Sequence, residues 1–222
     1  MVTVVTDVGR TPRADQVGAT RLHILATAER LFAEQGLYAV SNRQISAAAG
    51  QGNNAAVGYH FGTKADLVRA IVRRHVERIE PLRRELVTAA EGSADVRDWV
   101  DCLVRPFTTH LASLGDPTWF ARFGAQAMTD PAFRAIMVDE ALATSSLRDV
   151  LDGLDRCLPD LPADVRAERG DMIRDLVVHV CAERERAVAE NAVVVRSTWD
   201  EAAGGLVDAI TGLLLAPISR RA

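Results

Sequence analysis

Side chains that can bind phosphates or base edges are concentrated between residues 41 and 64. Protein surfaces that contact DNA use the same hydroxyl, amide, basic and aromatic groups. For Asn53 and Asn54 the alternative is helix capping alone. His60 could instead pack against Phe61, and Arg43 could be a solvated charge. The predicted DNA-contacting residues are Ser41, Asn42, Arg43, Gln44, Asn53, Asn54, Tyr59, His60, Thr63 and Lys64.

Signals for catalysis are weak. The chain has no HExxH, GxSxG or phosphate-cradling glycine loop. His75, His110 and His179 are isolated in sequence, as structural histidines usually are. The three cysteines lie far apart without a CxxC pair, which favours buried thiols in a reducing cytosol. We therefore predict no catalytic residue, no metal site and no cofactor.

The elements that must position the DNA-contacting side chains are two short helices joined by a glycine turn, over residues 41–61. Ser41 and Gln44 have the spacing of a capping box, and Gly50 suits the end of the first helix. The second helix, from Ala55 to His60, has mostly small side chains. A short, nearly bare helix after a turn suits insertion into a DNA major groove.

Longer helices are expected on both sides of this motif. Apolar residues from Leu22 to Phe32 recur at helical spacing, which predicts a helix that ends near Gly36. Thr63 and Asp66 predict a second capping box at the start of a long helix. The helices together would enclose a small core.

The segments ILATAERLFAEQGL, SNRQISAAAG and YHFGTKADLV, within Thr20–His75, resemble the N-terminal domain of the tetracycline-repressor (TetR) family of bacterial transcription regulators. One departure is the QGNN turn, which is a residue longer than is usual there. The resemblance implies a homodimer that binds a near-palindromic operator in double-stranded DNA. It also implies a small apolar or aromatic effector, bound in the C-terminal core, that releases the protein from DNA.

The charge distribution supports DNA binding by one end of the chain. The net charge is −4, but residues 18–75 contain seven Arg or Lys and three Asp or Glu, which gives +4 and leaves −8 for the rest. We predict a disordered tail at 1–17, a DNA-binding domain at 18–75 and an effector and dimerisation domain at 76–222. The chain has no apolar run of the ~18 residues needed for a membrane span and no signal peptide, so we expect it in the cytoplasm.

The C-terminal part is predicted to be helical throughout, which makes the fold all-α with about nine helices. Pro81 predicts a bend or break in the long helix. Pro117 and Pro131 are expected to begin helices, the second running to Leu158. Ser197 is expected to cap the last helix.

Two functional surfaces are predicted in this part. Aromatic residues with interleaved polar groups suggest an effector pocket, although such a stripe also suits a plain core. Small residues on the last helix leave a flat face that, by resemblance, belongs to a homodimer interface; packing within one chain is the alternative. The predicted effector-binding residues are Trp99, Phe107, His110, Trp119, Phe123 and Phe133. The predicted dimerisation residues are Leu176, Val180, Gly205, Ala209, Gly212 and Leu213.

The sequence therefore predicts a DNA-binding transcription regulator, a repressor released by a small molecule, and not an enzyme. Two other classes stay open. One is a DNA-binding adaptor whose C-terminal half binds no ligand. The other is a helical enzyme in which the helix–turn–helix is only structural, and the missing catalytic residues speak against it.

Overall fold

Helices are the only regular elements in the computed structural model, which describes residues 12–158 and 160–218. Within these ranges no helix is long and apolar enough to cross a membrane. The all-α prediction is confirmed, with ten described helices instead of about nine. They are α1 Pro12–Gln35, α2 Asn42–Ala48, α3 Ala56–Phe61, α4 Lys64–Ala89, α5 Val96–Ser113, α6 Phe120–Met128, α7 Pro131–Leu142, α8 Ser145–Cys157, α9 Ala163–Ala189 and α10 Trp199–Leu215.

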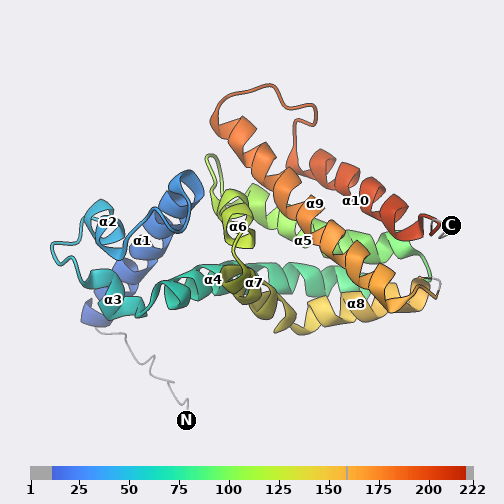
Figure 1. Cartoon of the computed structure of the whole chain (residues 1–222), viewed down its shortest axis with the longest axis horizontal. Coiled ribbons are helices and arrows are strands. Elements are labelled where there is room, and N and C mark those ends of the chain that lie inside the picture. The colour runs from blue at the N-terminus through green and yellow to red at the C-terminus, as the bar shows by residue number, and fades with distance from the viewer. Residues whose placement is uncertain (1–11, 159, 219–222) are drawn as a thin grey trace, which may run out of the picture.

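The helices form two groups that share α4 (Figure 1). Helices α1, α2 and α3 pack together at one end, and α4 begins against them. Further along, α4 packs against α5, α7 and α8, while α9 and α10 lie over α6 and α5 respectively. Because α4 contributes to both cores, the predicted division at residue 75 falls inside one helix, and it stays a prediction.

Helix α4 runs through Pro81 without the break that the sequence left open. Its start is fixed by the predicted capping box, in which Thr63 and Asp66 each accept the other's backbone N–H. Its buried face extends from Leu67 to Arg83 and packs against other helices over its whole length. This packing offsets the cost of an internal proline, about 3 kcal/mol.

The expected single helix from Pro131 to Leu158 is wrong, because the chain divides there into α7 and α8. Thr144 is the N-cap of α8, but its side chain makes no capping hydrogen bond. Glu80 of α4 supplies that acceptor instead, with 3.3 Å from the Ser146 N–H to Oε1. A carboxylate from another helix thus stabilises the start of α8.

Three other helix starts differ from the predictions. Helix α1 already begins at Pro12, where the fixed φ of proline suits the first helical position, although a disordered tail was expected up to residue 17. The rest of that predicted tail, residues 1–11, lies outside the described residues. Helix α6 begins at Phe120 and not at Pro117. Thr198, not Ser197, caps α10, through a capping box with Glu201.

Candidate DNA interface and regulatory core

Helix α2 begins with the capping box predicted from its sequence. The Gln44 N–H donates to Ser41 Oγ at 3.2 Å, and the Ser41 N–H donates to Gln44 Oε1 at 2.8 Å. Both side chains are exposed, yet both are used in this cap. Arg43 is exposed beside them and makes no hydrogen bond or ion pair within the described residues. Of these three predicted DNA contacts, Arg43 therefore has the freest side chain.

The turn between α2 and α3 is held by a buried hydroxyl. Gly50 adopts a φ of +64°, the left-handed conformation expected at this helix end. Ser46 Oγ donates to the Asn54 carbonyl at 3.2 Å and accepts the Val57 N–H at 3.4 Å. Asn53 Oδ1 accepts the Ala55 N–H at 2.9 Å. Asn53 therefore shapes the turn and does not cap α3, which begins without a side-chain cap.

Helix α3 presents one large side chain to the outside. Tyr59 is 83% exposed, whereas Val57 and Phe61 are buried against α1, α2 and α4. His60 contacts the rings on both sides, with a centroid distance of 5.1 Å to Tyr59. Its carbonyl accepts a hydrogen bond of 2.6 Å from Nη1 of Arg21. Helix α3 thus exposes Tyr59 on a short surface whose other side chains are mostly small.

Lys64 lies at the start of α4 as predicted, but its ammonium group points to the protein. Nζ donates to the Leu37 carbonyl at 2.6 Å and to the Val40 carbonyl at 2.8 Å. Burial lowers the pKa of this amine. A lysine engaged with two carbonyls holds the loop after α1 against α4, and only its third N–H is left for a phosphate. That Lys64 contacts a phosphate stays a prediction.

Polar contacts join the first three helices to the C-terminal group. Glu140 of α7 accepts two hydrogen bonds from Arg73 of α4, at 2.9 and 3.0 Å. The Tyr38 hydroxyl donates to Asp130, which caps α7, and this bond raises the pKa of Tyr38. These contacts tie α4, α7 and the loop after α1 together.

A buried chain of three titratable groups crosses the same boundary. Glu29 of α1, His75 of α4 and His110 of α5 are all less than a tenth exposed. The distance is 2.8 Å from Glu29 Oε2 to His75 Nε2 and 2.7 Å from His75 Nδ1 to His110 Nε2. Burial, with nearby His75, Arg74 and Arg78, lowers the pKa of His110 to about 4. His110 is thus a partner of His75 in this structure, and its contact with an effector stays a prediction.

The other predicted effector residues pack in different places among the described helices. Phe120 stacks on His75 with 3.7 Å between the ring centroids, and Phe107 and Phe123 pack in turn against Phe120. Phe133 packs instead against Tyr38 near the DNA-binding helices. Trp119 lies next to α6 as its N-cap residue. Most of these side chains therefore pack as in a plain aromatic core, which was the alternative to an effector pocket.

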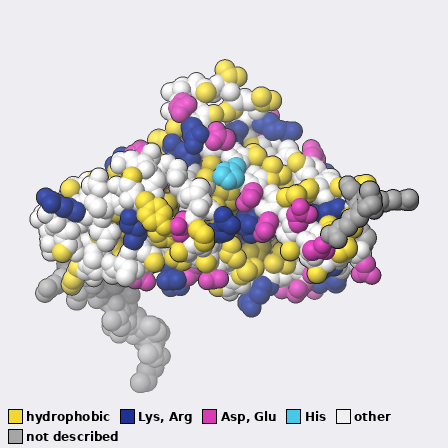
Figure 2. Space-filling view, in the orientation of Figure 1, with side chains coloured by type: hydrophobic (Ala, Val, Ile, Leu, Met, Phe, Trp, Pro, Cys, Tyr) yellow, Lys and Arg dark blue, Asp and Glu magenta, His cyan; other side chains and the backbone are white. Residues whose placement is uncertain are grey.

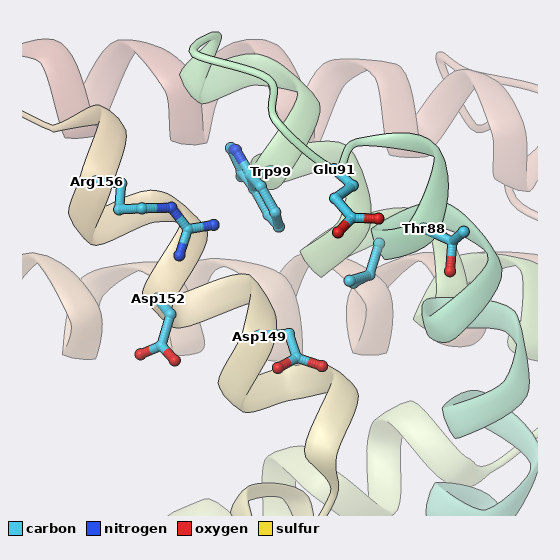
Figure 3. A pocket seen from close by; sticks show the side chains of 7 residues that line it. Thr88, Glu91, Trp99, Asp149, Asp152 and Arg156 are labelled. Carbon is cyan, nitrogen blue, oxygen red and sulfur yellow. The ribbon is translucent and has the colours of Figure 1, made fainter.

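Trp99 lines a cavity that opens between α4, α5 and α8 (Figure 3). Its volume is about 330 Å³. Trp99 forms the inner wall, fixed by a hydrogen bond of 3.1 Å from Nε1 to the Ser93 carbonyl. Arg156 reaches from α8 toward the ring, with Cζ 5.3 Å from the ring centroid. The other residues that line it are Val87, Thr88, Glu91, Asp149 and Asp152.

A second hollow, of about 400 Å³, lies between α9, α10 and the loop that joins them. Leu176, Val180, Gly205 and Ala209, four of the six predicted dimerisation residues, line it. Gly205 is covered by its own chain, because an added Cβ would lie 2.8 Å from Cζ of Arg196. Gly212 is open and Leu213 packs partly against the core.

The joining loop carries fully exposed apolar side chains. Val193 is 98% exposed, and Val195 is as exposed as in an extended chain. Figure 2 shows hydrophobic atoms at the tip of this loop, at the top of the view. Apolar groups that project into water beside an apolar hollow are typical of a surface that another molecule covers.

Sequence reasoning missed the residues that connect the helices. Nothing local marks Glu29 as the partner of His75, or Glu140 as the partner of Arg73, since only the folded chain brings them together. In the described part of the chain, no group of three or more His, Cys, Asp or Glu is arranged to hold a metal ion.

Two family models match the sequence. Residues 24–71 match "Bacterial regulatory proteins, tetR family", and residues 101–212, half of the chain, match "Tetracyclin repressor-like, C-terminal domain". The first match contains α2 and α3 and the second contains the Trp119 and Phe123 region and most of the α9 and α10 surface. A comparison with curated proteins gives no match.

A comparison with solved structures gives a match that shares the fold. A tetR-family transcription regulator from Shewanella sp. PV-4 is 14% identical, with 89% of this chain and 99% of that chain covered and a TM-score of 0.59. A TetR-family regulator from Streptomyces coelicolor A3 is 23% identical, covers 93% and 98% of the two chains and has a TM-score of 0.45. The family matches confirm the resemblance seen in the sequence: this chain belongs to the tetR family of bacterial regulatory proteins and is a DNA-binding transcription regulator.

Proposed function

We propose that the protein is a homodimeric repressor that leaves its operator when a small molecule binds between α4, α5 and α8. The observation that carries this proposal is the sharing of α4. Its first turn holds the loop after α1 through Lys64, and its last turn borders the cavity at Trp99 through Val87 and Thr88. A ligand that displaces the end of α4 would shift the position of α2 and α3.

The effect on DNA affinity depends on how differently the ligand binds the two arrangements. Coupling energies between sites are typically about 1–3 kcal/mol, which is roughly 5–150-fold in affinity. The ion pairs of Arg73 with Glu140 and the hydrogen bond of Tyr38 to Asp130 are candidates for contacts that change between the two states.

For the DNA contact, we propose that Arg43, Asn54 and Tyr59 reach the bases or phosphates directly. All three are exposed and have no hydrogen bond from their side chains to other described residues. Ser41, Gln44, Asn53, Thr63 and Lys64 support them by fixing the two helix starts and the turn. Asn42 and His60 lie at the edges of this surface and contribute less.

We propose that a second copy of the chain covers α9, α10 and the loop with Val193 and Val195. Two copies would place two reading heads on the two halves of a near-palindromic operator, as helix–turn–helix dimers require. The cytoplasm, where the DNA is, is the proposed location.

Genomic footprinting with the purified protein tests the function. The expected result is protection of a few near-palindromic sites, each with half-sites about one helical turn of DNA apart. Protection without sequence preference would contradict the proposal of an operator-specific regulator.

The filled aromatic core around Phe120 favours a second candidate, an adaptor that binds DNA but no small molecule. A thermal-shift screen with small organic molecules distinguishes the two. Compounds that raise the unfolding midpoint and also release operator DNA support the repressor. Stabilising compounds that never release DNA favour the adaptor.

A further inference from the structure

Arg83 is a buried charge in the C-terminal core. It lies one turn after Ile79 on the buried face of α4, and the other residues of this face are mostly apolar. The side chain is only 8% exposed, and its Nε has no hydrogen-bond partner. Arg83 also makes no hydrogen bond or ion pair with any other described residue. A buried guanidinium without an anion is costly, and such a group calls for an explanation.

The nearest carboxylate is already committed elsewhere. Glu80, one turn before Arg83, binds Arg84 at 2.8 Å and the start of α8 through Ser145 and Ser146. These hydrogen bonds lower the pKa of Glu80 against the effect of its burial, so the carboxylate stays ionised where it lies. Its charge acts on Arg83 from a distance, without an ion pair.

Cys102, the other titratable group near Arg83, cannot supply the negative charge either. Cys102 of α5 is close enough to Arg83 for each charge to influence the other, but burial and nearby acids raise the pKa of this thiol to about 11. Cys102 is therefore neutral at ordinary pH. Arginine does not lose its own proton in proteins, so the positive charge remains.

Arg83 and Cys102 do not line the cavity at Trp99, but each lies one helical turn from a residue that does. Val87, one helical turn after Arg83 on α4, lines the cavity, and so does Trp99, which precedes Cys102 by one turn on α5. A ligand that reached Arg83 from the opening would therefore pass the aromatic ring of Trp99 and the aliphatic side chain of Val87. At the rim stand Glu91, Asp149 and Asp152, together with Arg156 (Figure 3).

We propose that Arg83 anchors the carboxylate of a small organic acid whose apolar body lies against Trp99 and Val87. The acidic rim adds a charge requirement: the outer end of the ligand is neutral or cationic, because a second carboxylate would face Glu91, Asp149 and Asp152. This inference rests on the proposed function, in that the ligand is the effector of the repressor, and it specifies the chemical class.

Benzoate and hydrocinnamate are suitable probes, with benzamide as the neutral match and terephthalate as the dicarboxylate. We expect the two monocarboxylates to bind the full-length wild-type protein at millimolar concentration or below by titration calorimetry. Benzamide and terephthalate should bind at least about ten-fold more weakly, because a charge-assisted contact is lost or a repulsion is added. Equal binding of benzoate and benzamide would overturn the proposal.

Arg83→Met should weaken benzoate binding by about ten- to a hundred-fold, and Arg83→Lys should recover part of it. The matched control is Arg78→Met, an exposed arginine on the same helix, which should leave the affinity unchanged. If Arg83→Met does not fold, NMR of the wild-type protein decides: benzoate must shift the Nε–H resonance that Arg83→Lys removes. Full affinity in Arg83→Met, or no shifted resonance, would overturn the assignment.

Operator release separates this inference from the proposed function. If benzoate binds through Arg83 but operator affinity does not change, the carboxylate site stands and the effector role fails. If no specific operator exists, the proposed function fails, while the calorimetric result still decides the site. If no monocarboxylate binds at millimolar concentration, the site fails whatever the DNA experiments give.

Discussion

Lys64 is the only lysine in the chain, and its two carbonyl contacts make it a structural residue. We expect Lys64→Met to lower the free energy of unfolding by about 1–3 kcal/mol, because two charge-assisted hydrogen bonds are lost. Urea denaturation measures this change. The exposed Arg43 is the matched control, and Arg43→Met should alter the free energy of unfolding by less than about 0.5 kcal/mol while weakening DNA binding.

A different result for Lys64→Met would support the prediction that Lys64 contacts a DNA phosphate. If Lys64→Met keeps its stability and instead loses DNA affinity with a smaller salt dependence, Lys64 is a phosphate contact after all. The two outcomes are distinct because the loss of a phosphate contact does not affect unfolding of the free protein.

His110 predicts a pH dependence of stability. Its pKa is about 4 in the folded protein and near 6.5 when unfolded, so the unfolded chain binds more protons between these values. The free energy of unfolding therefore falls as the pH drops from about 6.5 to 4, by up to roughly 3 kcal/mol from this group. Denaturant titrations across this range should show a flatter profile for His110→Gln, which keeps a polar side chain beside His75.

The exposed His23 on α1 provides the control for this measurement. His23→Gln should leave the slope of the wild-type profile unchanged. A His110→Gln profile as steep as that of the wild-type protein would mean that other groups cause the acid sensitivity.

At the scale of single residues, the sequence predicted caps and missed partners. The roles of Ser41 with Gln44 and of Thr63 with Asp66 depend on neighbours three residues away, and both capping boxes are confirmed. The partner of His75 is 35 residues further on, and the carbonyls bound by Lys64 are 24 and 27 residues back. Such pairs form only when whole helices pack, so no local pattern announces them.

Among the helices, the contact between α5 and α8 depends on a glycine, Gly153, whose lack of a side chain lets Trp99 approach α8. A Cβ added to Gly153 of α8 would lie 2.2 Å from Cδ2 of Trp99. Gly153→Ala must therefore displace the indole or push α8 away, and we expect a loss of about 1–3 kcal/mol in the free energy of unfolding. Thermal denaturation measures the loss, and altered tryptophan fluorescence would locate it at Trp99.

Gly170 on α9 is the comparison for this substitution, because a Cβ added there would meet no atom within 4 Å. Gly170→Ala should stabilise the protein by about 0.5–1 kcal/mol, as alanine favours a helix over glycine. A Gly153→Ala protein as stable as Gly170→Ala would show that the α5 and α8 contact can adjust freely.

Most helices could be predicted from periodicity and caps, whereas the errors occur where another helix supplies the decisive contact. The start of α8 is stabilised by Glu80 of α4. The start of α6 is held in the same way by Glu185 of α9, whose carboxylate accepts the Ala121 and Arg122 N–H groups at 3.1 and 2.9 Å. Both carboxylates are distant in sequence from the helices they cap, so proline positions alone misplaced these starts.

On the scale of the whole molecule, α4 connects the surface that would read DNA with the core that would bind the effector. The sequence predicted the capped start of this long helix, and it also predicted that aromatic residues cluster after Trp99. It could not tell that Phe120 would stack on His75 and Phe123 on Phe120, so that the rings fill the space. Whether an aromatic side chain lines a void or fills it depends on the crossing of several helices.

The assembly provides the last prediction. Ala209 is exposed in the apolar hollow between α9 and α10, so a second copy seated there would bury it. Ala209→Arg would place a long charged side chain in this contact, where desolvation is costly. We expect sedimentation to show a folded monomer, and operator affinity to fall because one reading head binds a half-site without the other.

Ala135→Arg is the matched control, because Ala135 is exposed on α7, away from α9 and α10. It adds the same charge without touching the hollow, so it should remain a dimer with full operator affinity. If Ala209→Arg also stays dimeric, the exposed Val193 and Val195 of the adjoining loop need another partner. The two α3 helices would then be paired through a different face, and the half-site spacing in the footprint would have to be explained from that face.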